Sequence, residues 1–249
     1  MSLKGKTILT TRAASQSGAL RAKFEAAGAR VIEVPTIEIK PVDDWTDVDT
    51  AIADLGNYQW LIFTSANAVD LFLGRAKLMN KSVTTPIAVV GTATARRVRD
   101  WALQPAIVPK EFRAEGLLEA MPADLTGASI LFPRAEVARE MLPVELRRRG
   151  ARVDVRIVYR TVKTDVQSNA FQKTISTEHI DCVVFTSPSA VRNLAESIEQ
   201  PITEALKSVT IAAIGPVTAD AAKQLGLTVA IIPAESTIDS LILAVEQAI

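Results

Sequence analysis

The 249-residue sequence has few of the side chains that bind metals or form disulfides. It contains one cysteine, Cys182, and one histidine, His179. A zinc site built from several such ligands and a disulfide within the chain are therefore excluded. Cys182 lies in an apolar run, and we expect it to be a buried thiol.

The sequence also lacks an excess of charge of either sign. Lys and Arg together number 28, as do Asp and Glu, so the net charge is zero. This balance argues against a nucleic-acid partner bound through bulk charge. The most basic stretch, residues 145–156, is interpreted as a solvated helix end followed by a strand.

No apolar run approaches the roughly 18 residues of a membrane span, and no charged-apolar-small signal pattern begins the sequence. We therefore expect a cytoplasmic protein with no membrane partner. The composition is 48% hydrophobic, which is enough to form packed cores.

Three common catalytic or nucleotide-binding motifs are missing: GxGxxG, GxxxxGK[ST] and GxSxG. A Ser-His-Asp triad would have to use His179, which precedes an apolar run at 182–186. In parallel α/β sheets the ligand sites lie at the carboxyl ends of the strands, so His179 is at the wrong end. We interpret it as a surface residue.

What the sequence does contain is an internal repeat. The stretch LIFTSANAV (61–69) returns 122 residues later as VVFTSPSAV (183–191), and six of nine positions match or exchange Ile for Val. PIAVVGTATA (86–95) returns as TIAAIGPVTA (210–219) at an offset of 124. A repeat of this length indicates two copies of a domain-sized unit rather than a solenoid.

Each copy predicts strands that alternate with helices. Gly28 is expected to end the first helix in a left-handed conformation, and Ser65 is expected to cap the second. The alternation predicts an α/β protein of two similar parallel-sheet domains, flavodoxin- or Rossmann-like, with a cleft between them. In the first copy the strands are predicted at residues 8–12, 31–34, 60–64 and 87–91.

Two domain boundaries are compatible with this repeat. One is a simple cut near residue 125. In the other, residues 37–40 and 158–162 are paired linker strands. Residues 1–36 plus 163–249 then form a discontinuous first domain, and residues 41–157 form the second. The residues alone leave both divisions open.

Small hydroxyl residues, glycines and arginines follow the predicted strands in both copies. Each hydroxyl could simply cap its own helix. Together, however, helix N-termini and arginines attract carboxylates or phosphates, so two such faces predict a site for a polyanion. The candidate binding residues are Arg12, Thr64, Ser65, Gly91, Thr92, Thr94, Arg134, Thr186, Ser187, Ser189, Gly215, Pro216 and Thr218.

The order and spacing of these motifs resemble the uroporphyrinogen-III synthase family from about residue 7 to residue 245. The motifs are the doubled FTS..AV, the pair VVGTATA and AIGPVTA, and IVYRT at 157–161. The resemblance implies two domains on a two-stranded linker, which favours the crossed division. It also implies a lyase of porphyrin and haem biosynthesis that uses no cofactor or metal.

The implied substrate is hydroxymethylbilane, a linear tetrapyrrole with eight carboxylates. Its cyclisation to uroporphyrinogen III loses water and inverts ring D through azafulvene and spiro intermediates. We expect a monomer, and a transient contact with the upstream or downstream pathway enzyme is left open.

The resemblance gives Tyr159 the role of donor to the leaving hydroxyl, since a phenol is a neutral donor at pH 7. The alternative is a tyrosine that only packs in the linker. The family's cleft hydroxyls match Thr94, Ser187 and Thr218; Thr64, Ser65, Thr186, Ser189 and Arg12 match more weakly. Asn67 and Thr92 depart from the second copy, which argues against equal roles for the two copies.

Two other classes of function compete with this one. A non-catalytic two-lobed binding protein for a small polyanion would use the same helix N-termini. A two-domain nucleotide-sugar transferase would need a carboxylate for ribose at matching positions. The nearest pair is Glu111 and Glu235, which we interpret as loop or first-turn residues.

Overall fold

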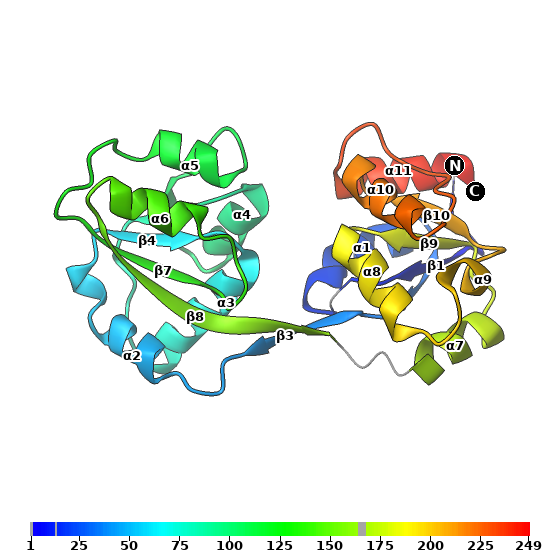
Figure 1. The fold of residues 1–249 in the computed structure, drawn as a ribbon, viewed down its shortest axis with the longest axis horizontal. Coiled ribbons are helices and arrows are strands. Elements are labelled where there is room, and N and C mark those ends of the chain that lie inside the picture. Colours follow the sequence, from blue (N-terminus) through cyan, green and yellow to red (C-terminus); the bar gives the residue numbers. More distant parts are fainter. Residues whose placement is uncertain (1, 13, 164–167) are drawn as a thin grey trace. The chain divides into compact units, whose positions relative to one another are not determined.

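The computed structural model describes residues 2–12, 14–163 and 168–249. Residues 164–167, which the expected discontinuous domain includes, lie outside the described residues. The chain divides into two compact units: unit 1 is Met1–Glu38 with Val162–Ile249, and unit 2 is Ile39–Thr161 (Figure 1). The chain passes between them within β3 (Ile37–Pro41) and again within β8 (Arg152–Lys163), which are neighbouring strands of one sheet.

Unit 1 contains a four-stranded sheet in the order β10-β9-β1-β2, and every pair in it is parallel. Residues of α1 and α11 pack on one face of this sheet, and residues of α7, α8 and α10 pack on the other. Its strands are β1 (Thr7–Thr10), β2 (Arg30–Glu33), β9 (Cys182–Phe185) and β10 (Thr210–Ala213). Its helices are α1 (Ala14–Ala26), α7 (Ser168–Thr177), α8 (Pro188–Ser197), α9 (Ile202–Ala205), α10 (Pro216–Gln224) and α11 (Ile238–Ala248).

Unit 2 is built around a six-stranded sheet in the order β3-β8-β7-β4-β5-β6, parallel from β8 to β6. Figure 1 shows α5 and α6 on one face of this sheet and α2 on the other. The remaining strands are β4 (Trp60–Phe63), β5 (Ile87–Val89), β6 (Pro105–Ile107) and β7 (Ser129–Ala135). The helices are α2 (Thr46–Ala53), the 3-10 turn η1 (Leu55–Asn57), α3 (Ala66–Leu78), α4 (Thr92–Asp100), α5 (Ala114–Ala120) and α6 (Met141–Arg148).

The central strands are buried on both faces, as their continuous apolar runs predict. Successive side chains of a strand point to opposite faces. In β4, Leu61 and Phe63 join the core beneath α2, α3 and α4, whereas Ile62 joins the core beneath α5 and α6. In β9, Val183 joins the core beneath α7, α8 and α10, whereas Val184 joins the core beneath α1 and α11.

The predicted parallel α/β architecture is confirmed, and so are several local expectations. Gly28 has a φ of 96°, and the Ser65 side chain accepts a hydrogen bond from the Ala68 N–H at 3.1 Å. His179 is on the surface, with 90% of its side chain exposed. Cys182 is fully buried, and burial raises the pKa of its thiol to about 12.

Seven elements were not predicted: α2, η1, α5, β6, α7, α9 and α11. The basic stretch is a helix end followed by a strand as expected, but it is only partly solvated. Arg148 is exposed, whereas Arg149 donates to the carbonyl oxygen of Leu118 at 2.6 Å. Both glutamates that were considered as ribose ligands, Glu111 and Glu235, lie in loops.

Two features are absent from the described part of the chain. No helix in it combines the length and the apolar character that a membrane crossing requires. Within the same residues, no three His, Cys, Asp or Glu side chains are grouped so that they could hold a metal ion.

Candidate active site

The candidate residues lie where parallel strands give way to helices, at the carboxyl edge of each sheet, except Arg134, which is still within β7, one residue before its end. In unit 2, Thr64 and Ser65 follow β4, and Gly91 follows β5. In unit 1, Thr186 and Ser187 follow β9. Parallel strands end at the same edge, so each unit gathers its own candidates there.

Tyr159 contributes its hydroxyl to this edge in unit 2. Its side chain is only 7% exposed and belongs to the core beneath α3. The hydroxyl lies 3.0 Å from the Ser65 Oγ, and that Oγ accepts from the Ala68 N–H. The Tyr159 ring is thus packed in the core and its hydroxyl is held by Ser65. These surroundings are compatible with a role as proton donor and equally with a role in packing alone.

Two glycines shape the turns after β5 and β10 for different reasons. Gly91 precedes α4 with a φ of 89°, a left-handed conformation that favours glycine. Gly215 precedes α10 in an extended conformation. A Cβ at Gly215 would clash with the Oγ of Ser236, a residue that the repeat analysis did not single out.

The residues after these glycines are arranged alike in the two copies. Thr92 and Pro216 begin α4 and α10 and are exposed. Thr94 and Thr218, each at the third position of its helix, are 4% and 3% exposed. The two predicted cleft hydroxyls are therefore on the inner side of their helices, and neither is freely exposed.

Serines provide a second cluster of hydroxyls in unit 1. Ser187 caps α8 by accepting from the Ala190 N–H at 3.1 Å, as Ser65 caps α3. Its Oγ also lies 3.0 Å from the Oγ of Ser189. Thr186, immediately before them, is half-buried. The capping role that the sequence left open therefore holds for Ser65 and Ser187.

Arg12 and Arg134 are 122 residues apart, the same offset as the repeated stretch at 61–69, but they have different surroundings. Arg134 is 6% exposed; it forms an ion pair with Glu140 and donates to the carbonyl oxygen of Arg139 at 3.3 Å. Arg12 is half-buried, and its guanidinium has no hydrogen-bond or ion-pair partner among the described residues. Burial lowers the pKa of Arg12. Among the described residues, Arg12 is thus the one of the two with no group that balances its charge.

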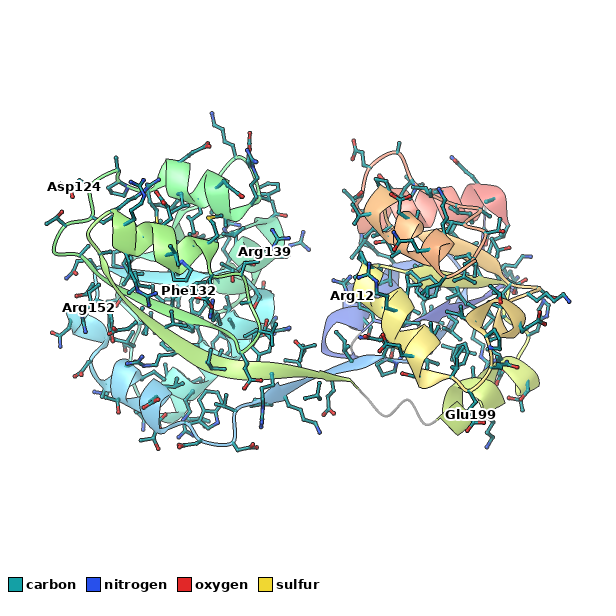
Figure 2. The ribbon with its side chains drawn as sticks, in the orientation of Figure 1. Arg12, Asp124, Phe132, Arg139, Arg152 and Glu199 are labelled. Carbon is teal, nitrogen blue, oxygen red and sulfur yellow. The ribbon has the colours of Figure 1, made fainter. Side chains whose placement is uncertain are left out.

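Sequence reasoning missed a pocket of about 330 Å³ at the carboxyl edge of unit 2. Thr64 was a candidate, but the other lining residues were not singled out, among them Phe112, Phe132 and Arg139. Figure 2 labels Phe132 and Arg139 in this unit. Phe112 and Arg139 lie in loops, which have no periodic pattern that would mark them, and Phe132 lies in β7.

Comparison with known proteins gives a consistent result. A family model described as "Uroporphyrinogen-III synthase HemD" matches residues 18–243. The uroporphyrinogen-III synthase of Synechococcus elongatus is 38% identical over 254 residues, covering 98% of this chain and 96% of its own.

Two solved structures extend the likeness to the fold. A mutant uroporphyrinogen III synthase from Thermus thermophilus has a TM-score of 0.63 at 18% identity and covers 98% of both chains. The uroporphyrinogen-III synthetase of Helicobacter pylori has a TM-score of 0.61 at 20% identity, covering 98% of this chain and 99% of its own. With the family match spanning most of the sequence, the chain belongs to the uroporphyrinogen-III synthase family.

Proposed function

We propose that the chain converts hydroxymethylbilane into uroporphyrinogen III with loss of water. As a member of its family it is a lyase of haem biosynthesis. The observation that carries the proposal is the match to this family along almost the whole chain. The hydroxyls and glycine turns at the carboxyl edges support it, because they suit a flexible substrate with many carboxylates.

The first step of the proposed mechanism is loss of the terminal hydroxyl group. The pyrrole nitrogen pushes out the hydroxyl, which takes a proton and leaves as water, and an azafulvene electrophile remains. Tyr159 is the proposed proton donor, because its hydroxyl is held at the edge of β4 by Ser65. Electron-rich pyrroles make this step easy, so little further machinery is required.

The next steps invert ring D. Its substituted carbon attacks the azafulvene to give a spiro intermediate, the older bond to that carbon breaks, and the ring closes through its other α-carbon. Loss of a proton from that carbon balances the proton taken at the start. The enzyme's main task is to hold the chain folded, and such positioning supplies roughly 7–11 kcal/mol in favourable intramolecular cases.

The binding roles of the candidate residues belong to this proposal. We assign carboxylate binding to Arg12 and to the helix N-termini beyond β4, β5, β9 and β10. The two-lobed arrangement on paired linker strands, with a shared substrate cleft, stays a prediction. So do the monomeric state, the cytoplasmic location and any contact with a neighbouring pathway enzyme.

The test is an assay with freshly prepared hydroxymethylbilane, after which the oxidised products are separated into type III and type I isomers. We expect type III to predominate and its yield to rise with enzyme concentration. A non-catalytic binding protein would leave the substrate to close spontaneously to type I. Type I alone, from folded protein, would therefore contradict the proposal.

A further inference from the structure

The pocket described above lies on the opposite face of the sheet from the Tyr159 side chain. Phe132 and Leu142, two of its lining residues, belong to the core beneath α5 and α6. Thr64 lines the pocket, whereas the next residue, Ser65, contacts Tyr159. A group bound in the pocket would therefore contact Thr64, the residue next to the serine that holds the proposed proton donor.

The pocket walls suit a flat, partly apolar group. Phe112 and the half-buried Val90 provide most of the accessible carbon surface, and Phe112 is 58% exposed. Phe132 and Leu142 are each 2% exposed and form the floor. A single exposed apolar side chain is common on a protein surface, but this one borders a concave site and can contact a group bound there. A volume of about 330 Å³ is at the lower end of the usual range for small-molecule sites, about 300–1,000 Å³.

The charge of the pocket is positive. Two arginines and no carboxylate line it among the described residues. Arg113 donates to Glu111 at 2.6 Å, so its charge is balanced. Arg139 has no ion-pair or hydrogen-bond partner for its guanidinium within the described chain. The pocket thus offers one unsatisfied cation beside an apolar wall.

Arg134 fixes the loop that presents this cation. Its guanidinium donates to the main-chain carbonyl of Arg139, pairs with Glu140, and lies 5.9 Å from the centre of the Phe132 ring. These contacts tie the loop between β7 and α6 to the pocket floor. The arginine that the repeat singled out is therefore placed to orient a second arginine rather than to meet a ligand itself.

We propose that this pocket binds one carboxylate-bearing pyrrole ring of the substrate, with Arg139 as its carboxylate ligand and Arg134 as a positioning residue. The inference rests on the proposed function. An acetate or propionate side chain would reach the guanidinium while its ring contacts Phe112 and Val90 above the pocket floor. Occupancy would hold one ring still while the reacting ends meet near Tyr159.

The first test is steady-state kinetics with hydroxymethylbilane. Arg139→Gln is expected to raise KM about tenfold, the loss of one charge-assisted hydrogen bond, with kcat nearly unchanged. Arg139→Lys should recover part of this loss. The control is Arg99→Gln, an exposed arginine in the last turn of α4, which should leave both constants unchanged.

Two further comparisons separate binding from folding. Ala138→Trp should fill the pocket and raise KM, whereas Val144→Trp, on the exposed face of α6, should not. Arg134→Gln should raise KM, but the double variant Arg134→Gln, Arg139→Gln should have the same KM as Arg139→Gln alone. If the two substitutions instead raised KM by independent factors that multiply in the double variant, Arg134 would not act by positioning Arg139.

The outcomes distinguish this inference from the function on which it rests. A wild-type protein that produces no type III isomer would overturn the proposed function. A wild-type protein that does produce it, with KM unchanged in both Arg139→Gln and Ala138→Trp, would overturn the pocket assignment alone.

Discussion

The hydroxyl of Tyr159 lies 3.0 Å from the Oγ of Ser65, across 94 residues of sequence. Ser65 also accepts the Ala68 N–H, so one serine both caps α3 and holds the phenol. Either oxygen can be the donor between the two hydroxyls. The contact fixes the phenol at the end of β4 and gives Ser65 a role beyond that of a helix cap.

This relationship predicts how two substitutions combine. Tyr159→Phe should lower kcat severalfold to tens of times, because it removes the proposed donor while the rest of the site still positions the substrate. Ser65→Ala should lower kcat less, and it should add little in the Tyr159→Phe background. The measurement is kcat for the four proteins of the cycle.

The loss of the cap must be separated from the effect on catalysis. Ser65→Ala should also reduce the free energy of unfolding by about 1 kcal/mol. Thr237→Ala removes an equivalent cap, the 3.1 Å bond from the Ser240 N–H at the start of α11, and should show the same stability loss with kcat unchanged. Complete loss of activity in folded Tyr159→Phe would contradict a mechanism based on positioning.

The arginines at matching repeat positions should respond differently to the same change. Arg134→Gln should destabilise the protein by about 1.5–3 kcal/mol, because it breaks the bonds to Glu140 and to the Arg139 carbonyl at a buried site. Arg12→Gln removes a half-buried charge with no partner in the described chain, so stability should not fall.

The measurements for this pair are urea unfolding and KM. Arg12→Gln is expected to raise KM, since its free guanidinium is a proposed carboxylate ligand. An Arg12→Gln protein that is clearly less stable than wild type would indicate that the guanidinium has a structural partner after all.

Much of the fold could be predicted because the strands are buried on both faces. Runs such as WLIF at β4 and CVVF at β9 are continuous and apolar, and Gly28 and Ser65 mark helix ends by their own chemistry. Pairing partners could not be predicted in this way. β1 pairs with β9, and periodicity does not indicate which distant strand a run will join.

The candidate site could likewise be predicted only in part. Turn residues after strands could be named because their positions follow from the strands themselves. The partner of Arg134 could not be named, although Glu140 is six residues away, because the loop conformation determines the contact. The exposure of the Phe112 side chain could not be predicted either, because a phenylalanine is expected to be buried and the sequence does not show that this one is exposed.

Gly215 lies close to the Ser236 side chain, so a substitution at Gly215 should destabilise the protein and a second substitution at Ser236 should reverse the effect. The Cβ in Gly215→Ala would clash with the Ser236 Oγ, and the exposed Ser236 side chain must rotate away, so we expect a loss of about 0.5–1.5 kcal/mol. Adding Ser236→Gly removes the opposing side chain and should restore most of it. Gly18→Ala, where a Cβ meets nothing within 4 Å in α1, should instead be neutral or stabilising. Urea unfolding measures all four proteins.

The amino edge of the unit 1 sheet has a carboxylate whose effect should depend on pH. Asp181 accepts from the Thr7 N–H at 2.8 Å and from the Lys6 Nζ at 3.2 Å. Burial opposes its ionisation, but these donors outweigh burial, and the pKa of Asp181 lies below its ordinary value. A lowered pKa means that the carboxylate stabilises the fold above its unfolded pKa, about 3.9. This contribution is lost as the pH falls through the folded value.

Asp181→Asn should therefore cost about 1–2 kcal/mol at pH 7, and the difference from wild type should shrink below about pH 4. The measurement is the free energy of unfolding in urea from pH 7 to pH 3. Asp220→Asn is the matched control, because that carboxylate is exposed on α10 and lies 3.9 Å from the Lys223 Nζ. A gap between Asp181→Asn and wild type that stays constant over this range would show that the carboxylate's charge contributes nothing. Because Asp181 precedes β9 and its donors lie at the start of β1, kcat should be unchanged in the folded variant.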